Sequence, residues 1–193
     1  MSVSNGVFIN TKDKLCQFEL NRELFRLVSS TNKIYQKIAV VAIGSDRSTG
    51  DSFGPLVGHM LSKYSIFDYD VYGTIHEPVH ALNIVETVSK IDTNNTLIIA
   101  VDASIGDFSH VGHIGLSDKP IKPGSGVGKD LPPVGDISLT GIVSIAGIGG
   151  LSNILLQTTS LGMVYKMAEI TSKSILNILY KLQRNKGTVR AFH

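Results

Sequence analysis

The chain has few of the residues that mark a secreted or membrane-spanning protein. Its 193 residues include one cysteine, Cys16, and no tryptophan. A single cysteine excludes an internal disulfide and is typical of proteins in a reducing compartment. No apolar run is long enough to cross a bilayer, and residues 1–20 lack the basic and apolar regions of a signal peptide. We therefore expect a cytoplasmic protein with no membrane partner.

Charge is also scarce. Charged residues make up 18% of the chain, and the formal net charge is +2. Lysine and arginine are scattered, with one modest cluster between Lys181 and Arg190, so no continuous basic face for nucleic acid can be drawn. Hydrophobic residues make up 42%, which suits a compact fold around a buried sheet. The length predicts one domain over residues 1–193, with residues 1–17 as a loosely held arm.

Apolar segments of strand and helix type alternate along the chain. Strands are predicted over 37–43, 70–75, 96–101 and 137–145, with an exposed antiparallel edge strand over 111–116. Helices are predicted over 18–28, 55–64, 78–91 and 161–184, and a long loop over 117–135. Strands that alternate with helices predict parallel pairing through crossovers. The fold class is therefore α/β, a three-layer α/β/α arrangement with a mostly parallel twisted sheet.

Aspartates follow two of the predicted strands. The run from Asp46 to Pro55 contains Asp51 and follows the first strand, and Asp102 follows the strand 96–101. Open α/β sheets bind ligands beyond the carboxyl ends of their strands. If the two strands are neighbours, both carboxylates face one crevice, and one pKa rises so that the pair can act as acid and base on a shared water. Such a pair also offers oxygen ligands to a metal. The alternative without catalysis is a turn aspartate and a loop cap.

Three other motifs match known sites in part. Gly50-Asp-Ser52 has the letters of the GDS-type esterase nucleophile, but the Gly-x-Asn-Asp block of those enzymes is absent. His76-Glu-Pro-Val-His80 matches the zinc motif H-E-x-x-H, but Pro78 breaks the helix that the motif needs. The segment Pro123–Asp130 resembles a phosphate loop without its Ser or Thr. Its glycines would still let the backbone approach a peptide or an anion. The aspartate pair remains the strongest candidate site.

Several of these segments resemble proteins of spore-forming bacteria. The strings Ile43–Gly58, Pro78–Asn83, Val101–Gly106 and Lys122–Gly128 resemble the YyaC-type sporulation proteins, and the match covers nearly all of residues 37–180. The Asp-x-x-Gly-Pro, Asp-Ala and Pro-Gly-Ser-Gly-Val-Gly segments are also similar to the spore germination protease. That protease shares an α/β fold, of the phosphorylase/hydrolase-like type, with the hydrogenase maturation endopeptidases. The resemblance implies this fold here.

The resemblance also implies where the active centre lies. In both relatives two acidic residues from these loops form it, and by motif they fall on Asp51 and Asp102. The residues expected to orient the pair or contact the substrate are Asp46, Arg47, Ser104, Gly124, Ser125, Gly126 and Gly128. The backbone N–H groups of the glycine loop would receive the developing oxyanion. This mechanism uses no cofactor.

The implied activity is peptide hydrolysis in the cytoplasm of a sporulating bacterium, in the forespore or the mother cell. The expected substrate is a protein or peptide, small acid-soluble spore proteins among them. The chain is about half the size of the germination protease, so its substrate need not be the same. Two alternatives stay open: a non-catalytic peptide-binding or regulatory protein, and a metal-dependent endopeptidase in which His110 or His113 assists the aspartates. A homo-oligomer also stays open.

Overall fold

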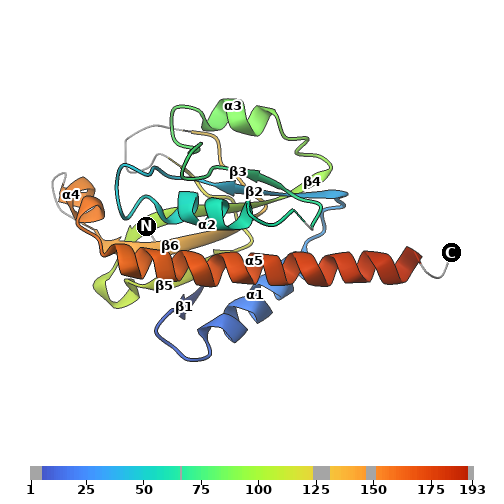
Figure 1. Ribbon diagram of the computed structural model, residues 1–193, viewed down its shortest axis with the longest axis horizontal. Coiled ribbons are helices and arrows are strands. Elements are labelled where there is room, and N and C mark those ends of the chain that lie inside the picture. Colours follow the sequence, from blue (N-terminus) through green and yellow to red (C-terminus); the bar gives the residue numbers. More distant parts are fainter. Residues whose placement is uncertain (1–5, 66, 124–130, 147–150, 191–193) are drawn as a thin grey trace.

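The described strands of the sheet lie between Val7 and Ile145. A computed structural model describes residues 6–65, 67–123, 131–146 and 151–190 (Figure 1). The strands within these ranges are β1 (Val7–Asn10), β2 (Lys37–Ala42), β3 (Asp70–Tyr72), β4 (Thr96–Gly106), β5 (His113–Ser117) and β6 (Ile137–Ile145). They form one sheet in the order β1-β5-β6-β4-β2-β3. The pairs β2–β3, β2–β4 and β4–β6 are parallel, and β5 is antiparallel to both of its neighbours.

Helices cover both faces of this sheet. The helices are α1 (Cys16–Ser30), α2 (Phe53–Leu61), α3 (Ile84–Ser89), α4 (Leu151–Gln157) and α5 (Leu161–Arg190), with a short 3-10 turn η1 at Phe108–His110. Figure 1 shows α3 on one side of the sheet and α1, α2 and α5 on the other. The expected three-layer α/β fold with a mostly parallel sheet is therefore confirmed. No helix among the described residues is both long and apolar enough to cross a bilayer.

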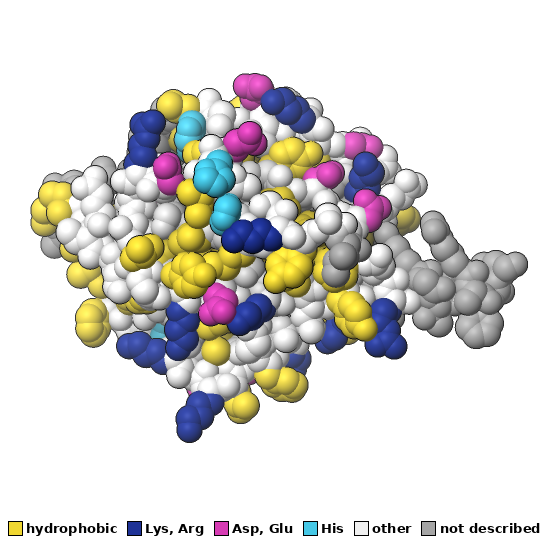
Figure 2. Space-filling model, viewed as in Figure 1, with side chains coloured by type: hydrophobic (Ala, Val, Ile, Leu, Met, Phe, Trp, Pro, Cys, Tyr) yellow, Lys and Arg dark blue, Asp and Glu magenta, His cyan; other side chains and the backbone are white. Residues whose placement is uncertain are grey.

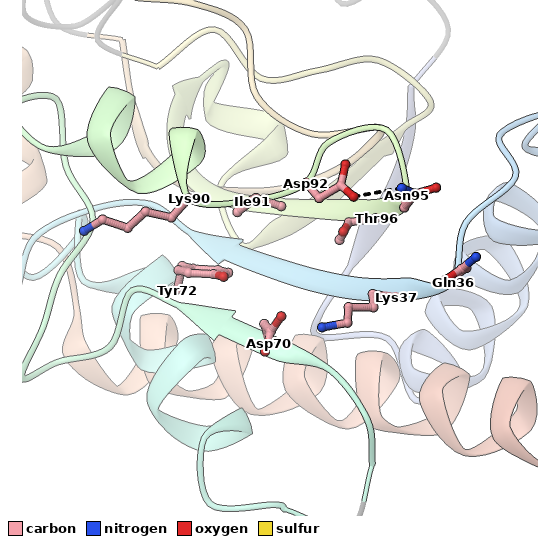
Figure 3. A pocket seen from close by; sticks show the side chains of 9 residues that line it. All are labelled: Gln36, Lys37, Asp70, Tyr72, Lys90, Ile91, Asp92, Asn95 and Thr96. Carbon is pink, nitrogen blue, oxygen red and sulfur yellow. Dashed lines mark hydrogen bonds between the residues drawn. The ribbon is translucent and has the colours of Figure 1, made fainter.

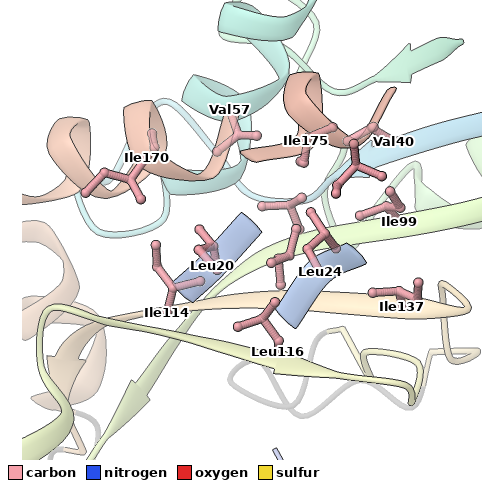
Figure 4. Close-up of a cluster of buried hydrophobic side chains, with 14 of the residues drawn as sticks. Leu20, Leu24, Val40, Val57, Ile99, Ile114, Leu116, Ile137, Ile170 and Ile175 are labelled. Atoms are coloured by element: carbon pink, nitrogen blue, oxygen red, sulfur yellow. The ribbon is translucent and has the colours of Figure 1, made fainter. Parts of the chain in front are cut away.

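Alternate side chains of the strands pack into two separate hydrophobic cores, one on each face of the sheet. In β4, Leu97, Ile99 and Val101 pack in the larger core with α1, α2 and α5, whereas Ile98 and Ala100 pack in the smaller core below α3. Figure 4 shows Leu20 and Leu24 of α1 and Ile175 of α5 gathered over Ile99 and Ile137 in the larger core. Because successive side chains of a strand point to opposite faces, Asp102 lies on the α3 face.

The amino-terminal region differs from the loose arm that the sequence predicts for residues 1–17. From Val7 to Asn10 the chain pairs with β5, Ile9 is buried, and α1 begins at the buried Cys16. Four residues of strand are too short to show a period in the sequence. Because β1 takes the edge of the sheet, β5 lies inside it and is buried. The prediction of an exposed edge strand over 111–116 is therefore wrong, but the predicted antiparallel pairing of this strand is confirmed.

The helix predicted over 78–91 is also shorter in the structure. Val79 pairs with Ile43 as an isolated bridge, and α3 begins only at Ile84. The Asn83 side chain holds the intervening turn, because its Oδ1 accepts the His80 N–H at 2.8 Å and its Nδ2 donates to the Pro78 carbonyl at 3.0 Å. Asparagine side chains that bond nearby backbone in this way favour turns over helices. The chain therefore approaches the end of β2 before it turns into α3.

Candidate functional site

Asp102 lies where β4 extends beyond the end of the neighbouring strand β2. The pairing of β2 with β4 ends at Ala42 opposite Val101, and β4 continues to Gly106. Asp102 is the first residue past this point, so it sits within the strand and not after its end as the sequence predicts. Its Oδ1 accepts the N–H of Ala103 at 2.8 Å. The carboxyl group is crowded by protein atoms, although the residue as a whole keeps some exposed surface.

Asp51 is held near the same place by a tight loop between β2 and α2. The loop turns at Gly44, whose φ is +143°, and its N–H donates to the Val79 carbonyl at 2.8 Å. The Ser45 N–H donates to the backbone carbonyl of Asp51 at 3.2 Å, which closes the loop. Asp51 is half-buried. The second residue of α2, Gly54, leaves no room for a Cβ against the Ile43 carbonyl, so the start of α2 presses on the end of β2.

The two carboxyl groups interact electrostatically. Burial raises the pKa of Asp51, while the Ser45 N–H and the nearby His80 lower it in part. The pKa of Asp102 is raised well above the ordinary range, first by burial and then by the negative charge of Asp51, with a smaller lowering by the Ala103 N–H. A like charge raises a carboxyl pKa only at short range. Because burial and the charge of Asp51 both raise the pKa of Asp102, we expect Asp102 to be the group that keeps a proton while Asp51 is ionised.

His80 is a third polar residue at this site. It follows Val79, and its positive charge lowers the pKa of Asp51. When the ring is neutral, Nδ1 accepts the Leu82 N–H at 3.3 Å and Nε2 carries the proton, whereas the charge that acts on Asp51 belongs to the protonated ring. The sequence presents His80 only as part of a zinc motif that Pro78 rules out. The signal that could have found it is its place directly after a short strand-like segment at the carboxyl edge of the sheet.

The other predicted site residues are distributed as follows. Asp46 and Arg47 are exposed in the turn that precedes Asp51, and neither forms an ion pair within the described ranges. Ser104 lies on the same face of β4 as Asp102, but its hydroxyl donates to the Ile105 carbonyl at 3.2 Å. The glycine-loop residues Gly124, Ser125, Gly126 and Gly128 lie outside the described residues.

The competing motifs do not assemble into sites. The Ser52 hydroxyl donates to the Thr49 carbonyl at 2.6 Å and is buried at the start of α2, which removes it as an esterase nucleophile. His76 lies in a bend and not in a zinc-binding helix, and its ring contacts that of His59 with centroids 5.3 Å apart. Within the part of the chain that the structure describes, no three His, Cys, Asp or Glu side chains are grouped closely enough to hold a metal ion.

A pocket lies at the opposite end of the strands. It is lined by Gln36, Lys37, Asp70, Tyr72, Lys90, Ile91, Asp92, Asn95 and Thr96, which Figure 3 shows around the amino ends of β2 and β4. Lys37 and Thr96 are the first residues of these two strands, whereas Asp102 lies near the carboxyl edge. Open α/β sheets bind their ligands at the carboxyl edge. We therefore place the candidate site at the aspartates and not in this pocket.

Comparisons with known proteins identify the family and the fold. The chain belongs to the DUF1256 family, described as a protein of unknown function, whose model matches residues 8–174. The uncharacterized protein YyaC of Bacillus subtilis (strain 168) is 44% identical over 152 residues, which are 77% of this chain and 73% of that protein. The crystal structure of the NiFe hydrogenase maturation protease HycI from Thermococcus kodakarensis KOD1 is similar with a TM-score of 0.54 and 20% identity, over 82% of this chain and 99% of that chain. At this identity the likeness shows a shared fold.

Proposed function

We propose that this DUF1256 protein is a peptidase that uses Asp51 and Asp102 to hydrolyse peptide bonds. The observation that supports this most strongly is the geometry: the loop after β2 carries Asp51 to the edge where Asp102 lies on the neighbouring strand β4, close enough for the charge of Asp51 to raise the pKa of Asp102. The pair lies at the carboxyl edge of a parallel sheet, where α/β proteins place their ligands. Pairs of titratable groups whose environments push their pKa values apart are typical of acid–base catalysts.

The proposed reaction divides the work between the two carboxyl groups. Asp51, as the ionised member, takes a proton from a water molecule, and the hydroxyl attacks the carbonyl carbon of the substrate. Asp102, as the protonated member, gives its proton to the carbonyl oxygen. When the tetrahedral intermediate collapses, Asp51 passes its proton to the leaving nitrogen and Asp102 recovers one from the hydroxyl. The pair therefore ends each turnover in the state in which it began.

The substrate and its cellular setting follow from the resemblance to sporulation proteins. We propose a protein or peptide substrate, with small acid-soluble spore proteins as the first candidates, in the cytoplasm of a sporulating cell. On the face in Figure 2, lysine and arginine side chains are interspersed with acidic and hydrophobic ones. This mixed face favours a polypeptide substrate over a nucleic acid, which binds a continuous basic surface. The same two aspartates carry the proposal whichever protein is cut.

The direct test is cleavage of unfolded peptides and of spore proteins by the purified protein. We expect Asp51→Asn and Asp102→Asn each to lower the cleavage rate by about 10²- to 10⁴-fold, which is the range for a general acid or base. The control is Asp118→Asn, an exposed aspartate after β5 that should leave the rate unchanged. Undiminished cleavage in both variants would remove the pair from the mechanism. Binding without cleavage would favour a regulatory protein, and loss of activity with a chelator would favour a metal-dependent one.

Replacement of His80 should change the pH dependence of this activity. Because the charge of His80 lowers the pKa of Asp51, His80→Ala should raise that pKa further. The acidic limb of the profile of kcat/KM against pH, which reports ionisation of the base, should then move to higher pH. The control is His76→Ala in the exposed bend nearby, which should leave the limb in place. An equal loss of rate at every pH in the His80 variant would assign it a structural role instead.

A further inference from the structure

Among the described residues, the part of β4 beyond Asp102 has one edge without a neighbouring strand. On one side, Asp102 to Gly106 pair with β6 from Thr140 to Ile145. On the other side the pairing with β2 stops at Val101, and no described strand continues it. This open edge, which comprises Ala103 to Gly106, is half-buried and begins at the candidate catalytic aspartate. A strand edge at this position can receive another polypeptide segment.

The backbone groups of the open edge alternate between β6 and the open side, and the pairing with β6 shifts register between Ser104 and Ile105. The Val101 carbonyl faces β2, because it accepts the Ile43 N–H at 2.7 Å, and the Gly106 carbonyl faces β6, because it accepts the Ala146 N–H at 3.1 Å. Successive residues of a strand direct their N–H and C=O groups to alternate sides. Ala103 and Ile105 therefore face the side that β2 has left. The Ala103 N–H, which a longer β2 would bind, donates instead to the Asp102 carboxylate.

This edge is short, but it carries neither charge nor proline. Natural edges are made short, or carry charged residues or proline, to prevent another chain from pairing with them. At the outer edges of this sheet, β1 has four residues and β3 has three. The open edge is as short as β1, but it reads Ala-Ser-Ile-Gly, without charge or proline. Just beyond it lies Phe108, whose side chain is 85% exposed and could contact an apolar side chain.

We propose that the substrate binds as an extended strand along this open edge and so brings its peptide bond to Asp51 and Asp102. The inference rests on the proposed function and defines the form of the substrate. The substrate class is an unfolded or flexible polypeptide segment, because a residue already paired in a sheet or helix has no backbone groups to offer. The Ile105 N–H would bind the residues that flank the cleaved bond, together with the Ile105 carbonyl, which also accepts the Ser104 hydroxyl at 3.2 Å. Successive side chains of the bound substrate would then point alternately to one face of the sheet and to the other.

The test compares two variants of Ile105, one that loses the backbone N–H and one that keeps it. Ile105→Pro removes the N–H, and proline is tolerated at an edge whose N–H faces away from the sheet. Ile105→Ala shortens the side chain and keeps the N–H, so it is the matched control. Binding of fluorescein-labelled casein, an unfolded protein, is measured by anisotropy, together with its cleavage. We expect Ile105→Pro to bind about tenfold more weakly than Ile105→Ala, the effect of one lost hydrogen bond and an unpaired carbonyl.

A second measurement covers the case in which the proline variant does not fold. A decapeptide that binds the wild-type protein is methylated at one backbone nitrogen at a time, and we expect weaker binding at every second position, because only alternate residues bond the edge. Equal binding by the two Ile105 variants, or a methylation effect without a period of two, would overturn strand addition even if cleavage persists. No binding of casein by the wild-type protein would overturn it as well. Period-two binding without cleavage would retain strand addition and reject the peptidase.

Discussion

Replacement of Asp102 by asparagine is expected to remove most of the peptidase activity and to stabilise the folded protein at neutral pH. Asparagine has the shape of aspartate and can still accept the Ala103 N–H, which is 2.8 Å from Oδ1 in the native protein. It cannot donate or recover the catalytic proton, so the rate should fall by about 10²- to 10⁴-fold. It also carries no charge, so the burial and the repulsion by Asp51 that raise the pKa of Asp102 no longer oppose folding.

The same substitution should change how stability depends on pH. The pKa of Asp102 is higher in the folded protein than in the unfolded chain, so the folded state binds this proton more tightly. That contribution to stability is complete below the ordinary aspartate range and is lost as the pH rises through the folded pKa. Thermal unfolding of both proteins across this pH range should show the wild-type midpoint falling relative to that of Asp102→Asn. Asp118→Asn should follow the wild-type curve.

Two outcomes would contradict this account of Asp102. Full activity in the asparagine variant would show that the carboxyl group transfers no proton in the reaction. A variant less stable than the wild type at every pH would show that the charged carboxylate stabilises the fold, as an aspartate with a favourable partner does. The two results are independent, because one is a rate and the other an unfolding midpoint.

The second large effect is expected at Gly54, where α2 meets β2. A Cβ at this position would overlap the Ile43 carbonyl oxygen and lie 2.9 Å from the Ile43 nitrogen. Backbone atoms cannot move aside as a flexible side chain can, so Gly54→Ala should lower the free energy of unfolding by about 3 kcal/mol. Asp51 lies three residues before Gly54, so activity should fall as well. Urea unfolding and the cleavage rate measure the two effects.

Gly162 provides a matched control for Gly54. Both glycines are the second residue of a helix, but a Cβ at Gly162 would meet only the Ser160 hydroxyl oxygen, at 3.9 Å. Gly162→Ala should leave the free energy of unfolding unchanged or raise it by up to about 1 kcal/mol, because alanine favours a helix over glycine. If both substitutions had the same small effect, the close approach of α2 to β2 would not position the Asp51 loop.

The layers of the fold could be predicted because the sequence repeats one local pattern. Apolar strand segments alternate with helices from Lys37 to Val101, and this order requires parallel strands in an α/β sheet. The pairing of β2 with β4 is the condition on which the aspartate site depends, and the structure meets it. The segment Asp46–Pro55 stood out because its charged and hydroxyl groups follow a buried strand.

Other features could not be predicted because they depend on residues far apart in the chain. β1 forms only because β5, more than a hundred residues away, offers it an edge. β4 extends past Val101 because β6 pairs with it there, although the residues 102–106 lack a strand pattern of their own. His80 reaches the site through the bridge between Val79 and Ile43, which no local periodicity reveals. Each of these contacts is set by the tertiary structure.

A carboxyl titration shows directly whether Asp51 and Asp102 share one site and whether Asp102 holds its proton there. Carbon-13 NMR of aspartate-labelled protein gives the pKa of Asp102 in the wild type and in Asp51→Asn. We predict that Asp102 titrates well above the ordinary aspartate range in the wild type and at lower pH once the Asp51 charge is gone. An Asp102 that titrates in the ordinary range, or that does not respond to Asp51→Asn, would show that the two carboxyl groups do not form one site.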